Sequence, residues 1–292
     1  MSSHPLAVLL EALDLTPLGQ DRFEGTAVER ERPRIFGGEL LAQTVVAASR
    51  TVKDRGCHSI HAHFLRPGRP ALPVEYRVRR VSDGARLARR HVTGWQRGRE
   101  ILLATVSFDS APEADDLSGH QHEPMPAVPG PEALRTEFEH RQEAAAAMRA
   151  ADRPWFLIPR AVEVRQVQPV PFFEPPAIPP VAHTWVRAIG RLPDDPALHR
   201  AVLAYASDLT LLDIACYPYG VNWADPRVEQ ASLDHAMWFH RPFRADDWLL
   251  YAQAVPTLAS GRAFARGTVW SRGGALVSSV TQEGLSRIRR DG

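Results

Sequence analysis

Alternation of apolar and polar residues dominates two stretches of the chain, and each stretch predicts three β-strands. Apolar side chains recur at every second position between short turns rich in glycine, which is typical of half-buried strands. The predicted strands are Pro73–Val81, Ala88–Gln96 and Ile101–Phe108, and then Trp248–Pro256, Ala263–Ser271 and Ala275–Gln282. Because the intervening turns are only a few residues long, each stretch is expected to form an antiparallel meander.

A helical pattern precedes each meander. Between Gly38 and Lys53, apolar residues recur at spacings of three and four, which predicts a helix buried along most of its surface. A second helix is predicted over Ser207–Cys216, with Asp208 in its N-cap and Pro218 as its stop. A strand is expected in front of it, at Trp185–Arg191. Since such an apolar helix needs cover on most sides, we predict an α+β protein with two hotdog units, each a curved antiparallel sheet around a central helix.

The two stretches are related by an internal repeat at an offset of 175 residues. Phe64-Leu65-Arg66-Pro67 then falls on Phe239-His240-Arg241-Pro242 without a gap. In the same register Tyr76 meets Tyr251, Thr93 meets Thr268, Trp95 meets Trp270 and Gly98 meets Gly273. Agreement of two aromatic residues and an Arg-Pro pair in one register indicates a duplication.

The duplication sets the expected domain organisation. We expect residues 1–112 to form the first unit and residues 161–292 the second. Residues 113–160 are expected to form a linker that carries a surface helix over Glu132–Ala151. The proline-rich segment Val167–Pro180 is expected to be an extended connection, because proline suits neither a helix interior nor a central strand.

Composition and charge argue against several classes of function. The 292 residues contain 35 basic and 34 acidic side chains, a net charge of +1, which lacks the basic excess of a nucleic-acid binder. Two cysteines, Cys57 and Cys216, are too few for a disulfide framework or a zinc site and are expected to be reduced thiols. Neither a secretory signal nor a membrane span is apparent, so a cytoplasmic protein is expected.

Familiar cofactor and nucleophile motifs are missing, and no cofactor is expected. The sequence has no glycine-rich phosphate loop, no HExxH and no GxSxG. His58, His61 and His63 form an HxxHxH cluster, but no acidic or cysteine partner lies at ligand spacing, so packing is favoured over a metal site. An arginine-rich stretch between Arg77 and Arg90 is interpreted as a solvated sheet face rather than a phosphate site.

A comparison of the two copies isolates three polar residues in the second. At the offset of 175, Ser232 corresponds to Cys57 and Gln282 to Ser107. Asp208 is matched with Gly38 after allowance for a difference in loop length. The second copy thus holds a carboxylate, a hydroxyl and an amide, whereas the first lacks the carboxylate and the amide and is expected to be degenerate. Taken alone, Asp208 is more simply a helix N-cap.

Longer segments resemble a known family, the type II (TesB-like) acyl-CoA thioesterases with a double-hotdog fold. The resemblance covers nearly the whole chain. It rests on Arg34–Gly38 with Gln43, His58–Gly68, Tyr205–Leu209, Ser232–Phe243 and Gln282–Gly284. The block Leu-Asp-His-Ala-Met-Trp-Phe-His-Arg-Pro-Phe within Ser232–Phe243 is its most specific part.

The resemblance implies an activity and roles for the three residues. In that family an Asp, a Ser or Thr, and a Gln hold the attacking water, and these roles fall on Asp208, Ser232 and Gln282. Asp208 would be the general base, and backbone N–H groups near Leu209 would stabilise the oxyanion. The expected partner is an acyl-CoA substrate, without metal or nucleic acid, and the expected assembly is a homodimer or homotetramer.

Two other functions remain as alternatives. Hotdog enoyl-CoA hydratases carry a His five residues after the Asp, and this chain has Asp213 there, which argues against hydration. An acyl-CoA-binding protein without activity would be expected to lack the full set of residues in both copies, and the second copy retains it.

Overall fold

The strands of the protein form one antiparallel sheet that runs through both halves of the chain. The computed structural model describes residues 4–28, 33–110, 119–150 and 153–289. In this part the strand order is β1-β2-β4-β5-β6-β3-β10-β13-β12-β11-β8-β7, with β9 beside β13. The strands of the first half are β1 (Thr16–Gly19), β2 (Arg22–Gly25), β3 (Gly56–Phe64), β4 (Val74–Asp83), β5 (Leu87–Gln96) and β6 (Arg99–Asp109). Those of the second half are β7 (Val162–Gln166), β8 (Val181–Ala188), β9 (Val228–Ser232), β10 (Asp234–Phe239), β11 (Leu249–Ala259), β12 (Arg262–Ser271) and β13 (Leu276–Ile288).

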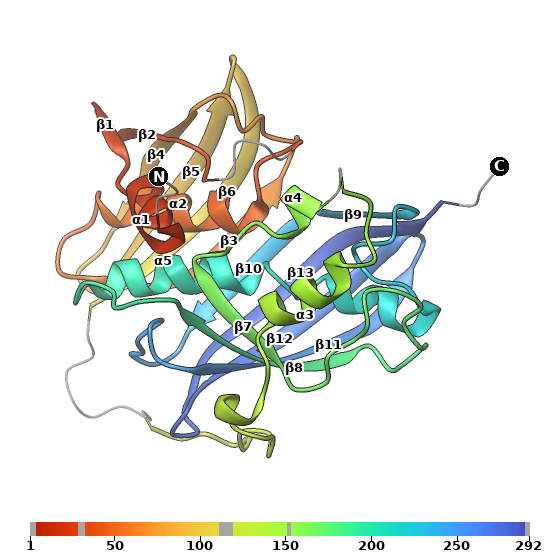
Figure 1. The fold of residues 1–292 in the computed structure, drawn as a ribbon. Helices are drawn as coiled ribbons and strands as arrows, with labels where there is room; N and C mark the ends of the chain where they lie inside the picture. Colours follow the sequence, from red (N-terminus) through yellow and green to blue (C-terminus); the bar gives the residue numbers. More distant parts are fainter. Residues whose placement is uncertain (1–3, 29–32, 111–118, 151–152, 290–292) are drawn as a thin grey trace.

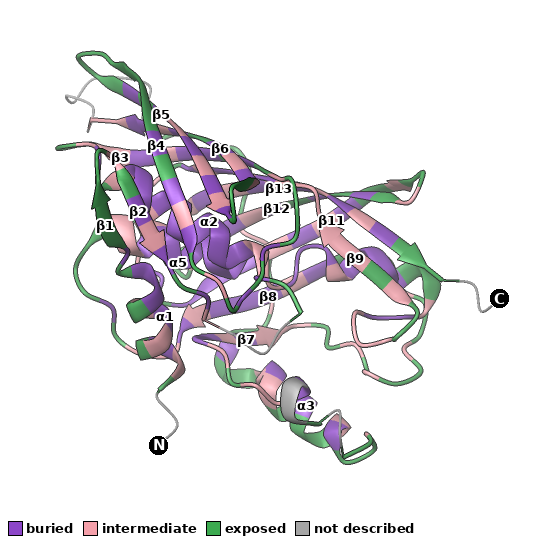
Figure 2. Ribbon diagram, turned by 90° about the horizontal axis from the view of Figure 1, so that it is seen from above, coloured by how far each residue is buried: buried purple, intermediate pink, exposed green. Residues whose placement is uncertain are grey.

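Two helices fill the inside of this curved sheet, one for each half (Figure 1). They are α2 (Gly37–Ser49) and α5 (Pro196–Ser207), and most of their residues are buried (Figure 2). The start of α2 lies against the end of α5, where a side chain on Gly38 would come within 2.4 Å of the Tyr205 carbonyl oxygen. Only glycine permits this approach. At the other ends, a Cβ on Gly56, beyond the end of α2, would lie 2.9 Å from the guanidinium of Arg200 in the first half of α5, so the helices pack in opposite directions. We call β1–β6 with α2 the first unit and β7–β13 with α5 the second unit.

The repeated tryptophans make the same hydrogen bond in both units, and the repeated tyrosines are buried in both. Trp95 Nε1 donates to Thr93 Oγ1 at 2.8 Å on β5, and Trp270 Nε1 donates to Thr268 Oγ1 at 3.0 Å on β12. Tyr76 and Tyr251 are both wholly buried. The units join where β3 pairs with β10, with Ile60 opposite Met237.

The second central helix differs from its prediction. It was expected over Ser207–Cys216, but α5 ends at Ser207, and Asp208 is its C-cap rather than its N-cap. The true start lies upstream, where Asp195 accepts a hydrogen bond from Ala197 N at 2.9 Å and Pro196 occupies the first turn. After Asp208 the chain turns into the 3₁₀ helix η2 (Asp213–Tyr219), which ends at Gly220. The counterpart of Asp208 at the C-cap of α2 is therefore Arg50, not Gly38.

The remaining elements refine the other predictions. The helix expected over Glu132–Ala151 is the shorter α3 (Glu137–Ala145), because a capping box between Thr136 and Glu139 sets its start. The strand expected at Trp185–Arg191 is β8, which begins earlier, at Val181. Residues 167–180 contain neither helix nor strand, as predicted.

The smaller elements are α1 (Pro5–Leu13), η1 (Pro131–Ala133) and α4 (Arg153–Phe156). Residues 111–118 of the expected linker lie outside the described residues.

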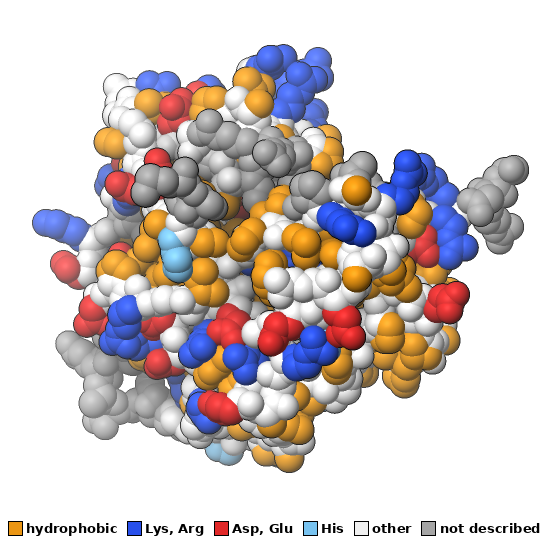
Figure 3. Space-filling view, viewed as in Figure 1, with side chains coloured by type: hydrophobic (Ala, Val, Ile, Leu, Met, Phe, Trp, Pro, Cys, Tyr) orange, Lys and Arg blue, Asp and Glu red, His pale blue; other side chains and the backbone are white. Residues whose placement is uncertain are grey.

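Charged side chains of both signs are mixed over the surface. On the face seen in Figure 3, acidic and basic groups lie close to one another. Ion pairs of the protein include Arg187 with Glu163 at 2.9 Å and Arg272 with Glu132 at 2.6 Å. In the described part of the chain, no helix is long and apolar enough to cross a membrane.

Candidate active site

Asp208, Ser232 and Gln282 lie in direct contact with one another. Ser232 Oγ donates to Asp208 Oδ1 at 3.1 Å. The side-chain amide nitrogen of Gln282 donates to the same Oδ1 at 2.8 Å and to Ser232 Oγ at 2.6 Å. The three residues come from the C-cap of α5, the last residue of β9 and the middle of β13. The structure thus brings together all three residues that the sequence singled out.

Strand alternation and one glycine explain why the three residues meet. Gln282 lies mid-strand, rather than at a strand end as expected, because β13 continues to Ile288. In the β9–β13 ladder Ser232 pairs with Gly284, the next residue on the same face as Gln282. A side chain at position 284 would come within 2.5 Å of Leu212. Glycine there lets the segment after Asp208 close onto the sheet.

The start of α2, in the first unit, supports the Asp208 carboxylate. A Cβ on Gly37 would lie 2.6 Å from Asp208 Oδ2, so the carboxylate and this backbone are nearly in contact. The Gly38 backbone hydrogen-bonds to the carboxylate. A helix N-terminus favours negative charge through its dipole and its unpaired N–H groups. Sequence reasoning treated Gly38 as the repeat partner of Asp208; the Gly37-Gly38 pair was the available signal for a close approach.

Burial is the dominant influence on the protonation of Asp208. Its side chain is only 4% exposed. Burial raises its pKa to about 6, while hydrogen bonds from Gln282, Ser232 and Gly38 and the charge of Arg34 act in the opposite direction. The carboxylate is therefore ionised at neutral pH and is a stronger base than an exposed aspartate.

The prediction that N–H groups near Leu209 stabilise the oxyanion assumed that a helix starts there, and this assumption is wrong. Leu209 was expected at a helix start, but it follows the end of α5, and its N–H donates to the Ala206 carbonyl at 3.1 Å. The C-terminal end of a helix also carries a partial negative charge, which repels an oxyanion.

A cavity of about 670 Å³ adjoins the carboxylate and is built by both units. Its volume suits a small organic ligand. Asp208 and Ser232 line it, while Gln282 is wholly buried outside the lining. Apolar side chains such as Phe36, Leu212 and Trp223 make part of the wall. The arginines of the lining are Arg34, Arg66, Arg141 and Arg160, and Arg141 comes from α3.

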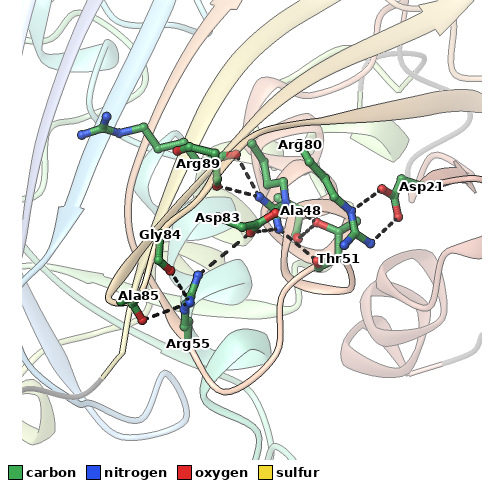
Figure 4. Close-up of polar contacts among 11 residues, drawn as sticks. Asp21, Ala48, Thr51, Arg55, Arg80, Asp83, Gly84, Ala85 and Arg89 are labelled. Atoms are coloured by element: carbon green, nitrogen blue, oxygen red, sulfur yellow. Dashed lines mark hydrogen bonds and ion pairs between the residues drawn. The ribbon is translucent and has the colours of Figure 1, made fainter.

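A smaller hollow of about 380 Å³ lies in the first unit and is lined mainly by basic residues. Figure 4 shows Arg55 and Arg80 turned toward oxygens of the protein. Arg90 is only 1% exposed and bonds to Thr51 and Asp83, Arg55 donates to Gly84 O, and Arg80 pairs with Asp21. The expectation of a solvated arginine face is thus wrong for Arg90, because its guanidinium pairs with Asp83 and donates to the carbonyl of Thr51, two residues after the end of α2.

The histidine cluster and the cysteines lie apart from the carboxylate. His61 is exposed and meets the ring of Trp238 edge-on at 4.9 Å. Among the described residues, no group of three His, Cys, Asp or Glu side chains could hold a metal ion. Cys57 and Cys216 are buried free thiols, and burial raises the pKa of each to about 12.

The fold and the site define a class of protein: a two-unit enzyme with a buried carboxylate beside a ligand-sized cavity. Residues 28–109 match the family model of the acyl-CoA thioesterase N-terminal domain, and residues 160–285 match that of acyl-CoA thioesterase. Human acyl-coenzyme A thioesterase 8 is 35% identical over 291 residues, which cover 95% of this chain and 88% of the relative. The chain therefore belongs to the acyl-CoA thioesterase family.

Solved structures support the same assignment and the fold. Acyl-CoA thioesterase II TesB2 of Mycobacterium marinum is 36% identical, with a TM-score of 0.75 over 96% of this chain and 98% of its own. A hotdog-fold protein of unknown function from Alicyclobacillus acidocaldarius has a TM-score of 0.76 at 20% identity and covers 99% of this chain and 100% of its own. The predicted double-hotdog fold and the TesB-like resemblance are confirmed.

Proposed function

We propose that this protein hydrolyses fatty acyl-CoA to a fatty acid and coenzyme A, using a water activated by Asp208. The observation that carries the proposal is the closed set of hydrogen bonds among Asp208, Ser232 and Gln282 at the edge of the cavity. A thioester carbonyl is already reactive, so its hydrolysis needs an oriented water, a base and a place for the oxyanion, without a protein nucleophile.

In the proposed reaction Asp208 takes a proton from water as the oxygen attacks the thioester carbonyl carbon. Gln282 holds the carboxylate and the Ser232 hydroxyl, and Ser232, which lines the cavity, positions the water. The tetrahedral intermediate then expels the thiolate by breaking the C–S bond, and Asp208 returns the proton to the sulfur. The raised pKa of Asp208, about 6, suits a group that must both accept and return a proton near neutral pH.

We assign stabilisation of the oxyanion to the start of α2 instead of to Leu209. The first N–H groups of a helix have no partner within it, and those of α2 begin at Gly37, in the cavity wall. The Gly38 N–H bonds to the Asp208 carboxylate and those of Glu39 and Leu40 donate to the Phe36 carbonyl. We therefore propose that the Gly37 N–H stabilises the oxyanion, aided by the helix dipole. The first unit would then take part in the chemistry of the second.

The lining of the cavity suits the two parts of the substrate. Its apolar side chains would hold the acyl chain, and Arg34 and Arg66 would face the phosphates of coenzyme A, whereas Arg141 and Arg160 are ion-paired with Glu137. The expected homodimer or homotetramer and the cytoplasmic location stay predictions.

Thiol release from acyl-CoA tests the proposal. Purified protein should liberate coenzyme A from substrates with acyl chains between about two and eighteen carbons, with a preference set by the cavity. An enoyl-CoA substrate should lose its thioester and not gain water across its double bond. No thiol release at any chain length would overturn the proposed function.

A further inference from the structure

His235 lies beside the proposed catalytic residues but has no role in the reaction described so far. It belongs to β10 and is wholly buried. Its Nε2 lies 2.9 Å from Ser207 Oγ, on the residue just before Asp208. Its Nδ1 is 3.9 Å from Asp208 Oδ1, which is beyond hydrogen-bond reach. A direct His–Asp pair therefore does not explain the histidine.

Two buried atoms at this place each need a partner. By direct hydrogen bonds alone, His235 Nδ1 and Gln282 Oε1 are both unsatisfied in the described part of the chain. Buried polar atoms in proteins are nearly always paired. The ring is one residue beyond the Ala236–Thr281 pair of the β10–β13 ladder, which places it across from Gln282.

One tautomer of a neutral ring satisfies both atoms. If Nδ1 carries the proton, it donates to Gln282 Oε1, and Nε2 accepts the hydroxyl proton of Ser207, which then points to the ring rather than to the Ala204 carbonyl oxygen, also 2.9 Å from Ser207 Oγ. If Nε2 carries the proton, it donates to Ser207 Oγ, whose own proton goes to the Ala204 carbonyl oxygen. Nδ1 and Gln282 Oε1 are then both acceptors, and neither satisfies the other. Burial lowers the pKa of His235 to about 4, and hydrogen bonding with Gln282 only partly offsets this, so the ring is neutral at pH 7.

The direction of the Gln282 amide matters for the proposed reaction. Its nitrogen donates to both Asp208 and Ser232. A half-turn of the amide would place its oxygen against the Asp208 carboxylate, where two acceptors repel. Whatever holds the amide oxygen therefore also holds the carboxylate in position.

We propose that His235 is a positioning residue, whose Nδ1–H donates to Gln282 Oε1 and fixes the amide with its nitrogen toward Asp208 and Ser232. The proposal rests on the proposed function. The first unit supports it: at the offset of 175, Ile60 and Ser107 stand in place of His235 and Gln282, and in the β3–β6 ladder the residue opposite Ser107 is Ser59, which is not a histidine either. The histidine is absent from the unit that has no amide to position.

Two matched substitutions separate the two ring nitrogens. In His235→Asn the amide nitrogen occupies the place of Nδ1 and can still donate to Gln282. In His235→Gln the amide reaches the place of Nε2 and can keep Ser207, but it has no donor for Gln282. We expect kcat for thiol release to fall about 100-fold in His235→Gln and less than about fivefold in His235→Asn, with KM little changed in either. Equal effects in the two variants would overturn the proposal.

A double substitution controls for a merely structural effect. In a Gln282→Met background the amide oxygen is gone, so His235→Gln should cause little further loss of kcat. A further loss of the full 100-fold would show that the histidine acts elsewhere and would contradict the proposal.

A measurement on the unmodified protein removes any dependence on how the variants fold. The ¹⁵N NMR signals of His235 at pH 7 should show a neutral ring protonated on Nδ1. A ring protonated on Nε2, or on both nitrogens, would overturn the proposal. Absence of thiol release by the wild type would instead refute the proposed function, so the two failures are distinguishable.

Discussion

The two units share a fold but end their central helices in different ways. In the second unit the C-cap of α5 is Asp208, whose carboxylate meets Ser232 and Gln282 beside the large cavity. In the first unit the C-cap of α2 is Arg50, and the next residue, Thr51, is tied down by Arg90. The same helix end thus carries the candidate site in one unit and a structural cap in the other.

The difference also shows that the second unit does not work alone. The carboxylate of Asp208 lies against Gly37 and Gly38, which begin the helix of the first unit. The opposed packing of α2 and α5 brings the end of one helix to the start of the other. A duplicated chain can therefore lose one set of reactive side chains and still need both helices.

Loss of the Asp208 charge should have the largest effect. Asp208→Asn keeps the size of the side chain but removes the base, so kcat should fall about 1,000-fold. Asp194→Asn is the control, because that carboxylate is 96% exposed and pairs with Arg244 instead. Thiol-release rates that stay within tenfold of the wild type in Asp208→Asn would contradict the role of Asp208.

A methyl group in the first unit should impair the second. In Gly37→Ala the new Cβ would lie 2.6 Å from Asp208 Oδ2, so the carboxylate must shift, and kcat should fall about 100-fold. Gly273→Ala is the matched control, since only Ser271 Oγ lies near its Cβ, at 3.9 Å. If both variants keep wild-type kcat at an unchanged melting temperature, the first unit does not contribute to the site.

The hydroxyl of Ser232 should matter less than the carboxylate. Ser232→Ala removes a donor to Asp208 and an acceptor for Gln282, and kcat should fall roughly 30-fold. Ser232→Thr keeps the hydroxyl and should stay within about threefold. Cys57→Ser, at the corresponding position of the first unit, should leave kcat unchanged; a loss there would place chemistry in the first unit.

Arg90 should matter for stability and hardly for catalysis. Arg90→Ala removes a buried guanidinium that bonds to Asp83 and to the carbonyl of Thr51, so the free energy of unfolding should fall by about 2 kcal/mol. Asp83 keeps its ion pair with Arg55, at 4.0 Å. Denaturant unfolding measures this loss, and kcat below the transition should stay within about twofold. A large loss of kcat in a folded Arg90→Ala protein would mean that the two helix ends are coupled.

Much of this arrangement could be predicted from local patterns in the sequence. The meanders follow from period-two alternation, and the candidate residues follow from comparing Cys57 with Ser232 and Ser107 with Gln282. Both depend on spacing along the chain, which a repeat preserves.

The remainder depends on contacts between distant segments. The second helix was misplaced because Ser207-Asp208 resembles an N-cap, while the true cap at Asp195-Pro196 was overlooked. The closeness of Gly37 to Asp208, and of His235 to Gln282, arises only when the helices and strands pack. No local pattern reports such contacts, although the Gly37-Gly38 pair hinted at a close approach.

The pH dependence of kcat/KM for thiol release tests the central claim most directly, because its acid limb reports the base of the free enzyme. Only ionised Asp208 can accept a proton, and its pKa is raised to about 6, so activity should be lost as the pH falls through that value. The account predicts about a tenfold loss for each pH unit below about 6, and no such limb in the residual activity of Asp208→Asn. A wild-type profile that stays flat down to about pH 4.5, or a limb that persists in Asp208→Asn, would contradict it.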